Sequence, residues 1–485
     1  IQSLNQLQGI PRSFAELCNL STLDLCYNNL TGDLSQFSSM RVLDLSDNQL
    51  NGSLTSVLSI YENRLNGTIP ETIGNPSELK HLDVGFNSLE GVVSEAHFLN
   101  LSKLQHLDLS YNSLTLQFPS YWMPPFNLDS LHLGFCDMGP RFPKWLVGQT
   151  NISELDISGA RISDNIPVWF WNLSPYLSFL NLSNNQMSGM LPNLSSEYPL
   201  YIGTDFSSNQ FEGPLPVFPS NTTSLNLSNN KFLGSISVIC KIMGGALSFL
   251  DLSITYYPGG FLNVLWKIPA WIGESLSSLI FLSLHSNEFS GSIPLHPCQL
   301  AKIQIFDLSV NNISGTIPKC LNNFTSMVKE GESEHMIENS YANKALIEWK
   351  GSEYEYGRNL GLLRIINFAS NKLTGEIPEE ITPMLEVIVL NLSRNNLAGV
   401  MQEKTVQLKQ LPSLDFSENR LSGRIPTSGD LNFLSHLNLA YNNLSGRIPS
   451  STQLRSFDAS AFNDNPALCG APITQKCPDT SKSTS

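Results

Sequence analysis

The string LxLxxN recurs along most of the chain and limits the folds that the chain can adopt. Its asparagines are Asn28, Asn48, Asn63, Asn87, Asn112, Asn185, Asn209, Asn230, Asn287, Asn311, Asn371, Asn395, Asn419 and Asn442. Several neighbouring pairs, such as Asn63 and Asn87, lie 24 residues apart. A fixed period of roughly 20 to 50 residues indicates a stack of similar units, each of which contacts only its neighbours. We therefore predict a solenoid with a core that runs along the stack.

Each repeat is predicted to contain a short strand that ends at the Asn. In the stretch Leu131-His132-Leu133, alternation directs both leucines into the core and leaves His132 on the open face. The Asn amide has two donors and an acceptor, so a buried Asn can satisfy backbone groups where the chain leaves the sheet. Cys136 fills the Asn position in one repeat, and Ala160 and Thr255 fill it in two others.

A second string, LxGxIP, follows the Asn in many repeats. It occupies residues 65–70, 313–318, 373–378, 421–426 and 444–449. Gly permits a turn, and Pro restricts the segment after it to extended or early-helical geometry. The two strings together resemble the plant-specific class of leucine-rich repeats, which implies a second short strand and 3₁₀ or helical turns on the outside. The predicted fold is an α/β repeat solenoid: a plant-type leucine-rich-repeat superhelix with a parallel β-sheet on its concave face and a non-repeat island.

The period fails at three places. The step from Asn48 to Asn63 is 15 residues, the step from Thr255 to Asn287 is 32, and the step from Asn311 to Asn371 is 60. The first two resemble internal deletions, and the third leaves room for an insertion besides one repeat. We therefore predict leucine-rich repeats over 1–321, degenerate near 49–62 and 254–272, an inserted island at 322–360, and the last repeats at 361–450.

The island departs from the leucine rhythm and is rich in aromatic residues. Its aromatic side chains of interest are Tyr341, Trp349, Tyr354 and Tyr356. One interpretation is a flexible solvated loop. Disordered segments are poor in aromatics, however, whereas Tyr and Trp are enriched at binding hot spots, which favours a binding element.

The net charge and the distribution of apolar residues argue against some partners and against a membrane span. The net charge of −14 argues against nucleic acid or an anionic membrane surface, because both would repel the chain. No apolar run is long enough to span a bilayer, and residues 1–9 lack the features of a secretory signal. We expect a mature fragment, or a chain that has lost its ends and has an uncapped first repeat.

Fifteen NxS/T sequons favour a secreted glycoprotein. Asn181, Asn226 and Asn391 lie inside predicted strands, where the repeat consensus explains the motif equally well. We predict glycosylation at Asn19, Asn100, Asn151, Asn172, Asn221, Asn312, Asn323 and Asn443.

The eight cysteines are compatible with disulfides in a secreted chain. Cys298 and Cys320 are 22 residues apart, nearly one repeat, so stacking can bring them within bonding distance. Buried thiols are predicted for the four remaining cysteines outside the C-terminal segment, which are Cys18, Cys26, Cys136 and Cys240. No cysteine spacing indicates a zinc site.

Three longer stretches carry a narrower resemblance. Residues 315–327 (GTIPKCLNNFTSM), 349–381 (WKGSEYEYGRN and the repeat after it) and 131–146 (LHLGFCDMGPRFPKWL) resemble plant receptor-like proteins, in particular the group of fungal-xylanase receptors and apple scab-resistance homologues. The resemblance covers about 17–478. It implies a cap in NPALCGAPITQKC, so residues 451–485 become cap and tail, with Cys469 paired to Cys477.

The resemblance also implies the function. Such receptors have no kinase domain and act outside the cell or at the plasma membrane in plant defence. It implies a microbial or plant extracellular protein as ligand, a somatic-embryogenesis-type receptor kinase as co-receptor, and an adaptor receptor kinase if the full-length protein has a membrane helix. Carried onto this chain, the ligand would contact Tyr111, His132, Phe135, Tyr341, Trp349, Lys350, Tyr354 and Tyr356. The co-receptor would contact Arg394, Glu418, His436, Asn438 and Tyr441.

Aspartate recurs in the exposed position between the strand leucines. The positions are Asp24, Asp44, Asp83, Asp108, Asp156, Asp205, Asp251, Asp307 and Asp415. Paired carboxylates can indicate glycosidase chemistry, but recurrence in the repeat explains these better. No nucleophile elbow, phosphate loop or HExxH pattern accompanies them, so we predict no enzyme, no cofactor and no metal. A secreted inhibitor resembling polygalacturonase-inhibiting proteins, a receptor for a developmental peptide and a truncated decoy remain alternatives.

Overall fold

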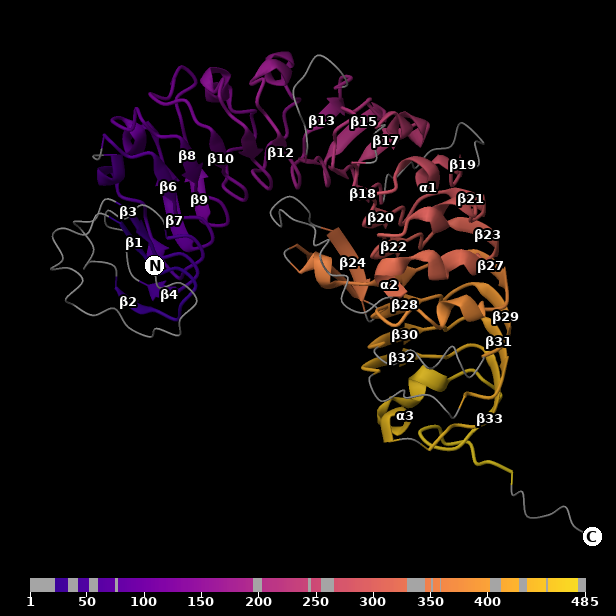
Figure 1. Cartoon of the computed structure of the whole chain (residues 1–485). Helices are drawn as coiled ribbons and strands as arrows, with labels where there is room; N and C mark the ends of the chain where they lie inside the picture. The colour runs from indigo at the N-terminus through magenta and orange to yellow at the C-terminus, as the bar shows by residue number, and fades with distance from the viewer. Residues whose placement is uncertain are drawn as a thin grey trace, which may run out of the picture. The chain divides into compact units, whose positions relative to one another are not determined.

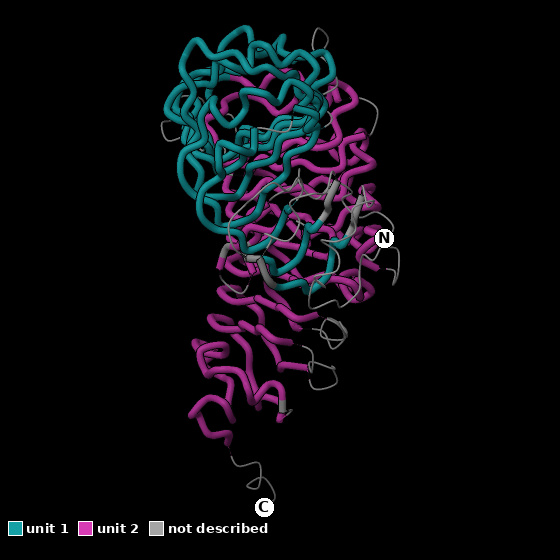
Figure 2. Tube along the Cα trace, turned by 90° about the vertical axis from the view of Figure 1, so that its left-hand side faces the viewer, with its two compact units in different colours: residues 1–213 teal, residues 214–485 magenta. Residues whose placement is uncertain are grey.

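The structure is a computed structural model of the 485-residue chain. It describes residues 22–33, 42–51, 60–74, 77–194, 203–242, 246–253, 266–328, 345–349, 352–357, 359–401, 411–426, 434–450 and 452–478. The chain divides into two compact units, unit 1 at residues 1–213 and unit 2 at residues 214–485 (Figure 2). Each unit is a stack of leucine-rich coils that contribute short strands to parallel sheets (Figure 1).

The first sheet of unit 1 is parallel and pairs strands from successive coils. Its strands are β6 (His81–Asp83), β8 (His106–Asp108), β10 (Ser130–His132), β11 (Glu154–Asp156), β12 (Phe179–Asn181) and β14 (Gly203–Asp205). Nearer the N-terminus, β1 (Thr22–Asp24) pairs with β3 (Val42–Asp44) in the same way. From β6 to β14 the middle residue of each strand of the first sheet, such as Leu107 or Leu131, is buried. Alternation therefore directs the leucines into the core, as the sequence predicts.

Unit 2 repeats this arrangement. Its parallel strands are β16 (Ser224–Asn226), β18 (Phe249–Asp251), β20 (Phe281–Ser283), β22 (Ile305–Asp307), β26 (Ile365–Asn367), β28 (Val389–Asn391), β30 (Ser413–Asp415) and β32 (His436–Asn438). Strands β22 and β26 are neighbours in the sheet although the island lies between them in sequence. The island is thus an insertion into one coil.

A second set of short strands lies on the other side of the coils. In unit 1 these are β2 (Thr31–Asp33), β4 (Gln49–Asn51), β5 (Asn66–Gly67), β7 (Ser88–Val93), β9 (Ser113–Leu116), β13 (Ser188–Met190) and β15 (Gln210–Pro214). In unit 2 they are β17 (Lys231–Leu233), β19 (Trp266–Lys267), β21 (Phe289–Ser292), β23 (Asn312–Thr316), β27 (Lys372–Gly375), β29 (Asn396–Val400), β31 (Arg420–Gly423), β33 (Asn443–Arg447) and β34 (Ala467–Cys469). Several end at a glycine with positive φ, such as Gly375, which explains the Gly of LxGxIP.

Short helices complete most coils. Those of unit 1 are η3 (Glu71–Gly74), η4 (Glu95–Phe98), η5 (Lys144–Gly148) and η6 (Val168–Asn172). Those of unit 2 are η7 (Ile236–Lys241), α1 (Trp271–Ser275), η8 (His296–Gln299), η9 (Lys319–Asn323), α2 (Thr325–Val328), η10 (Leu360–Leu362), η11 (Glu379–Ile381), α3 (Thr452–Ser456) and η14 (Ala459–Phe462). The second strands and outer 3₁₀ turns agree with the plant-type repeat.

The asparagines form a column of hydrogen bonds that links each coil to the next. The Asn87 amide donates to the carbonyl oxygens of Val84 and Gly85 in its own coil and of Ile60 in the preceding coil, at 3.1, 3.0 and 2.8 Å. Its Oδ1 accepts from the Leu65 N–H at 3.0 Å. Removing such an amide would leave buried backbone groups unsatisfied, at a cost of about 1 to 3 kcal/mol.

This column also continues across the irregular steps. Asn63 donates to the Leu45 carbonyl in the coil of Asn48, so a 15-residue step still places consecutive asparagines in neighbouring coils. Asn287 donates to Leu252, and Asn371 donates to Leu308, across the other two breaks. Shortened and interrupted repeats therefore keep the stacking register.

The aspartates of the repeat differ from the sequence prediction, which placed them in an exposed position. Asp108, Asp156, Asp205, Asp251 and Asp307 are buried, not exposed. Each carboxylate accepts a hydrogen bond from the backbone N–H two residues later, for example from Ser110 and Ser158, both at 2.8 Å. The side chain folds back over the strand end, where the next coil packs against it. These aspartates hold the turn after the strand, which makes a role in hydrolysis unnecessary to explain their recurrence.

The C-terminal segment closes unit 2. Strand β34 pairs in parallel with β33, and Asn465 continues the column by donating to Leu439 at 3.0 Å. Cys469 and Cys477 form a disulfide with a Cα separation of 4.9 Å. The expected pairing is therefore present, and the segment covers the last coil of the sheet.

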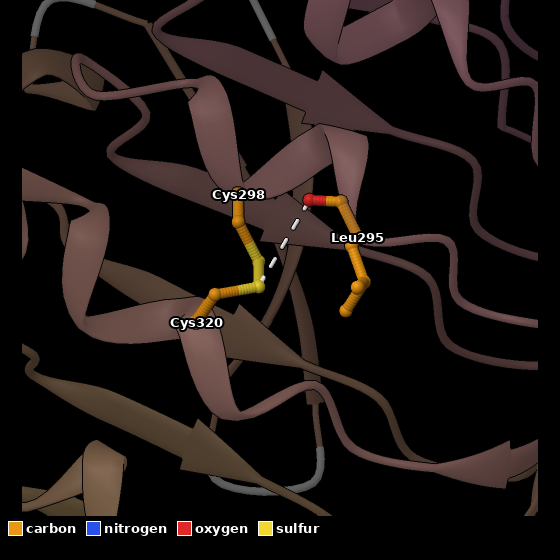
Figure 3. The surroundings of a disulfide bond; sticks show 3 residues. All are labelled: Leu295, Cys298 and Cys320. Atoms are coloured by element: carbon orange, nitrogen blue, oxygen red, sulfur yellow. Dashed lines mark hydrogen bonds between the residues drawn. A yellow bond between two sulfur atoms is a disulfide. The ribbon is translucent and has the colours of Figure 1, made fainter.

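The second expected disulfide joins Cys298 to Cys320, with a Cα separation of 5.7 Å (Figure 3). Cys298 lies in η8 and Cys320 in η9, so the bond ties the coil before the island to the entry of the island. The Leu295 carbonyl oxygen lies 3.9 Å from the Cys320 sulfur. Of the cysteines expected to be buried thiols, Cys136 is buried, but Cys26 and Cys240 are only partly buried. Cys18 lies outside the described residues.

Candidate functional site

The described part of the island includes an antiparallel hairpin that packs on the first sheet of unit 2. It consists of β24 (Ala345–Trp349) and β25 (Ser352–Tyr356), with Ile347 opposite Tyr354. Ala345 and Ile347 are buried, although the hairpin has only two strands. Because a two-stranded hairpin cannot bury a residue by itself, another element must cover this face.

The covering element is a row of apolar side chains on the strand face. The first residues of β18, β20, β22, β26 and β28 share one apolar cluster with Ala345 and Ile347; they are Phe249, Phe281, Ile305, Ile365 and Val389. The rings of Phe249 and Phe281 stack with centroids 4.2 Å apart. Figure 1 shows β24 beside these strands. The hairpin is therefore docked on the sheet and is not the solvated loop of the alternative interpretation.

Arg364 ties the two ends of the island together. Its guanidinium donates to the carbonyl oxygens of Ser326 at 3.3 Å, Gly361 at 2.9 Å and Leu363 at 3.0 Å. Ser326 lies in α2 before the hairpin, and Gly361 lies in η10 after it. Burial lowers the pKa of Arg364, and nearby Glu386 opposes that change. The side chain positions the island rather than binding a ligand.

The predicted ligand residues of the island fall into two groups. Trp349 and Tyr356 are partly buried against the apolar cluster, with ring centroids 6.3 Å apart, so part of each ring is used to seat the hairpin. Tyr354 and Leu346 have about half of their surface exposed, at 53% and 50%. Tyr341 and Lys350 lie outside the described residues. Of this set, Tyr354 is the one that the structure leaves most open to a partner.

In unit 1, two predicted ligand residues belong to a ladder of neighbouring aromatic rings from successive coils. The ring of Tyr111 lies 4.1 Å from that of Phe86 and 4.8 Å from that of Phe135, measured between centroids. Phe86 in turn lies 5.0 Å from the buried Tyr61. Phe86 was missed from the sequence, yet it occupies the same repeat position as Tyr111 and Phe135, one residue before the Asn slot. That shared position is the signal that could have found it.

The position before the Asn has an unusual backbone conformation. Phe86, Tyr111 and Phe135 have φ of 51°, 52° and 62°, in the left-handed region. The same slot elsewhere holds polar residues such as Asn184 and Ser208. A left-handed conformation costs about 1 to 3 kcal/mol for a residue other than Gly, and less for Asn or Asp. Aromatic or apolar residues also occupy this slot at Tyr27, Val310 and Tyr441, so the left-handed conformation is a feature of the repeat and not of the ladder alone.

A row of histidines lies beside the ladder. His81, His106 and His132 are on neighbouring strands, with ring centroids of 5.9 and 6.0 Å between successive pairs. His132 contacts Ser130 at 2.9 Å and pairs with Glu154 at 3.3 Å. The side chain of His132 is only 15% exposed, so it is less open than the sequence predicts, because these neighbours cover it.

The histidines differ in protonation. Burial, together with the nearby His132 and His81, lowers the pKa of His106 to about 4. Burial also opposes a charge on His132, but its hydrogen bond to Glu154 and the nearby Asp108 and Asp156 outweigh burial and raise its pKa. The hydrogen bond to His132 lowers the pKa of Glu154. The contact with Glu154 therefore favours the protonated form of His132, whereas burial favours the neutral form of His106.

The residues predicted to contact a co-receptor follow the island. Arg394, Glu418 and Tyr441 occupy the left-handed slot of three successive coils, which brings them into one column. Arg394 Nε pairs with Glu418 Oε1 at 3.0 Å, and the Tyr441 side chain is 57% exposed. His436 and Asn438 lie on β32 and are partly buried, and Asn438 donates to Asp415 at 3.5 Å. The column is open to solvent, whereas the two strand residues are partly covered.

The asparagines of the sequons differ in how far they are exposed. Asn100, Asn151, Asn172, Asn323 and Asn443 are exposed, and Asn221 and Asn312 are partly buried. Asn19 lies outside the described residues. The strand positions Asn181, Asn226 and Asn391 are buried at the ends of β12, β16 and β28. In the folded chain these three asparagines belong to the repeat, in agreement with their omission from the expected glycosylation sites.

Within the described ranges, no group of three or more His, Cys, Asp or Glu side chains is placed to hold a metal ion. Over the same residues, no helix combines the length and apolar character that crossing a bilayer requires.

Comparison with known proteins places the chain in a family. Leucine-rich-repeat models match residues 53–114 and, separately, 19–40, 151–173, 302–324, 362–384 and 433–454. Receptor-like protein EIX2 of Solanum lycopersicum is 41% identical over 370 residues, which are 61% of this chain and 36% of that protein. Receptor-like protein EIX1 of the same plant is 39% identical over 474 residues, 80% of this chain and 45% of that protein. The chain is a plant leucine-rich-repeat receptor-like protein.

This receptor-like protein spans less than half the length of these two relatives. Solved structures agree on the fold. The receptor in the crystal structure of PEPR1-AtPEP1 has a TM-score of 0.65 at 27% identity, covering 96% of this chain and 61% of that one. The plant peptide hormone receptor RGFR1 in complex with RGF2 has a TM-score of 0.63 at 25% identity, covering 96% and 81%. The relatives are named receptor-like proteins, and RGFR1 is named a plant peptide hormone receptor.

Proposed function

We propose that this chain is a non-enzymatic, extracellular ligand-binding ectodomain of a plant immune receptor-like protein. It recognises a microbial protein of the kind that degrades cell walls and recruits a receptor-kinase co-receptor. The observation that carries the proposal is the docked island hairpin. A non-repeat element held on the strand face at a fixed place, with Tyr354 and Leu346 exposed, provides a rigid binding feature on a shared scaffold.

Two further features support this proposal. The anchors of the island, Arg364 and the disulfide Cys298–Cys320, fix its ends from both sides. A rigid, preformed binding element loses less conformational entropy on binding than a loop that must order first. The family relationship to two tomato receptor-like proteins favours a role in defence.

The co-receptor is proposed to bind the column formed by Arg394, Glu418 and Tyr441. These side chains follow the island in sequence, occupy one slot in successive coils, and are substantially exposed. Tyr and Arg are frequent hot-spot residues, and a mixed-charge column can complement a polar rim. A somatic-embryogenesis-type receptor kinase is the expected partner, and an adaptor kinase would join through a membrane segment of the full-length protein.

Binding experiments test the proposal. The secreted chain would be assayed against fungal and oomycete cell-wall-degrading enzymes and against the ectodomain of a co-receptor kinase. We expect Tyr354→Ala to weaken ligand binding and Arg394→Ala with Tyr441→Ala to weaken co-receptor binding. Val310→Ala is the matched control, because Val310 is exposed in the same left-handed slot before the island. Absence of any ligand-dependent kinase association would contradict the proposal.

A peptide receptor is the second candidate. Two solved structures with the same fold carry bound peptides, AtPEP1 and RGF2. An inhibitor of wall-degrading enzymes is the third, and it would bind and inhibit the enzyme without recruiting a kinase. The same assay separates the three functions by which partner binds and whether the kinase follows.

A further inference from the structure

The second strands of unit 2 carry exposed arginines in neighbouring coils near the C-terminal cap. Arg420 begins β31, Arg424 follows the last residue of β31, and Arg447 ends β33. All three are exposed. We propose that these residues, called the arginine group, bind a linear polysaccharide built of uronic acid units. The inference goes beyond the proposed function, because it adds a partner that is neither the protein ligand nor the co-receptor, and it concerns unit 2 alone.

Alternation places the arginine group on the outer face of its sheet. Leu421 is buried in β31, so Arg420 and Ser422 on either side of it point away from the core. Leu444 is buried in β33 in the same way, and Arg447 lies on the opposite face of that strand. Strands β31 and β33 are parallel, hydrogen-bonded neighbours (Figure 1). The arginines therefore share one surface.

Two glycines with positive φ show in which direction the side chains run. A Cβ at Gly446 would lie 3.1 Å from Arg424 Cγ, and a Cβ at Gly470 would lie 3.4 Å from Arg447 Cγ. Each arginine thus extends across the glycine of the next coil. Because Arg447 directly follows Gly446, the Arg424 side chain approaches the end of β33 that carries Arg447. Like charges in neighbouring strands destabilise a sheet, so folding alone does not explain this arrangement.

The arginine group lacks acidic partners. Among the residues that the structure describes, no acidic side chain pairs with Arg424 or Arg447. Glu418 is close to Arg420 in sequence but pairs with Arg394 at 3.0 Å. Arg420 itself donates to a neutral side-chain amide of the preceding coil at 3.2 Å. These guanidinium groups are therefore available to an external anion, although the net charge of the chain is −14.

A carboxylate occurs earlier in the same column of side chains, at Glu376. A Cβ at Gly399 would lie 2.6 Å from Glu376 Cγ, so Glu376 extends over the coil of Val400. A Cβ at Gly423 would lie 2.8 Å from Val400 Cγ1, so Val400 occupies the position between Glu376 and Arg424. An uncharged side chain thus separates this carboxylate from the arginine group.

The groups between the arginines suit a sugar. A guanidinium recognises a carboxylate through two parallel N–H···O bonds. The hydroxyls of Ser422 and Ser445 donate to the carbonyl oxygens of Gly399 and Gly423, at 3.1 and 3.2 Å. Their oxygens can still accept hydrogen bonds from hydroxyl groups of a ligand. A polymer of uronic acids offers both carboxylates and hydroxyls in every unit, so it matches this surface.

Other polyanions fit this surface less well. Peptide interfaces are centred on aromatic or large apolar anchors, whereas the outward side chains of β31 and β33 are arginine, serine and asparagine. An anionic membrane would face a wide area of a chain whose net charge is −14 and would be repelled. A linear polymer contacts only the arginine group and a narrow strip around it, so it avoids most of that repulsion.

Asn443, a predicted glycosylation site, lies in the same sheet. It begins β33 and Arg447 ends it, so their Cα atoms are about 13 Å apart at about 3.3 Å per residue. A glycan on Asn443 would therefore be attached away from Arg447, but it would lie beside Ser422, which is opposite Asn443 in the sheet. N-glycans are removed enzymatically before the measurement so that they do not shield this surface.

The test measures binding of a short fluorescent oligogalacturonate to the full chain. Its methyl ester, which has the same sugar backbone but no charge, is the control ligand. We expect the acid form to bind, the ester not to bind, and added salt to weaken binding. Arg424→Gln and Arg447→Gln should each reduce the affinity about tenfold, because each removes a charged hydrogen-bond donor to a carboxylate. Arg424→Lys, which keeps the charge but not the planar fork, should retain intermediate affinity.

Arg141→Gln is the matched control variant, since Arg141 is an exposed arginine of unit 1. Unchanged affinity of Arg424→Gln and Arg447→Gln, an equal loss with Arg141→Gln, or equal binding of the methyl ester would each overturn the inference. Tighter binding of a polyglutamate peptide or of phosphatidylserine vesicles would also overturn it, in favour of a protein or a membrane partner. Thermal unfolding of each variant separates lost binding from lost folding, and we expect no change because these side chains are exposed.

Discussion

The strand faces of the two units use the same repeat position in opposite ways. In unit 2 the first residues of β18, β20 and β22 are Phe249, Phe281 and Ile305, and the island hairpin packs on them. In unit 1 the first residues of β6 and β8 are His81 and His106, which are at least partly exposed. The chemistry of this single position therefore indicates whether the sheet is covered or open.

Because of this difference, the strand faces of the two units have different roles. The apolar row of unit 2 is used to hold the chain's own island, so little of it is left for a partner. The open row of unit 1 lies beside the aromatic ladder and presents polar side chains. Under the proposed function, the exposed island residues of unit 2 and the open strand face of unit 1 are therefore two separate candidate surfaces for a ligand.

The largest expected effect follows from replacing an apolar residue under the hairpin. Phe281→Ala should destabilise unit 2 by about 3 to 5 kcal/mol, because it removes a fully buried ring that stacks on Phe249. Hydrogen exchange should increase at residues 345–356 before the rest of unit 2. His106→Ala, at the equivalent position of unit 1, should have a much smaller effect. Equal effects of the two changes would contradict the comparison.

The next effect concerns pH. Burial raises the pKa of Asp251 from 3.8 to about 6, and burial also raises the pKa of Asp307. The folded state therefore binds the Asp251 proton more tightly than the unfolded state does. The resulting stabilisation is complete below about pH 4 and is lost as pH rises through about 6. Since one pKa unit corresponds to about 1.4 kcal/mol, the loss is about 3 kcal/mol.

Asp251→Asn should remove this dependence. The Asn Oδ1 can still accept from the Ser253 N–H, as the carboxylate does at 2.9 Å, and Asn391 already fills the equivalent position. We expect the variant to unfold at higher denaturant concentration than the wild type at pH 7, with the difference vanishing near pH 4. Asp156→Asn in unit 1 shows whether the effect is particular to unit 2. If unit 2 of the wild type became more stable between pH 4 and pH 7, the predicted direction of the pH dependence would be wrong.

A smaller effect is expected for the island anchor. Arg364→Met keeps most of the apolar length of the side chain but removes its donors to Ser326, Gly361 and Leu363. The cost should be about 1 to 3 kcal/mol for the carbonyl groups left without partners. Proteolysis within the island should accelerate while unit 1 stays resistant. Arg394→Met, an exposed arginine, is the control, and similar proteolysis of both variants would argue against an anchoring role.

The smallest effect on stability is expected in the column after the island. Arg394 and Glu418 form an exposed pair, so a double-mutant cycle with alanine should give less than about 1 kcal/mol, and less still at high salt. Co-receptor affinity should nevertheless fall for both variants. A large stability change with unchanged affinity would make the pair structural and would remove it from the proposed interface.

Much of the fold could be predicted because the repeat encodes it. The positions of Asn87 and Asn112 in LxLxxN fix both the strands and the hydrogen-bonded column, since a buried amide must find backbone partners. The spacing of Cys298 and Cys320 anticipates their disulfide. The aspartate slot was placed on the correct strands but wrongly considered exposed. Alternation alone does not show that Asp108 folds back onto the Ser110 N–H.

The candidate site was predictable only in part. Tyr111 and Phe135 could be selected because they are aromatic, and Phe86 could have been found from its identical slot. The packing of Trp349 and Tyr356 against the apolar cluster could not be predicted from a repeat position. The island lies outside the repeat, so its sequence does not indicate which coils it will contact.

The sequence by itself determined the stacked coils, the asparagine column and the Cys298–Cys320 disulfide, because each depends on a spacing that repeats within one or two coils; the Cys469–Cys477 pairing was implied by the family resemblance. Only the tertiary structure decided that the island hairpin docks on Phe249, Phe281 and Ile305, and that the Tyr111 ring stacks on Phe86 and lies tilted against Phe135. These contacts join side chains that are close in space but belong to different coils or to a non-repeat insertion. Their partners depend on how surfaces pack, which a local pattern does not specify.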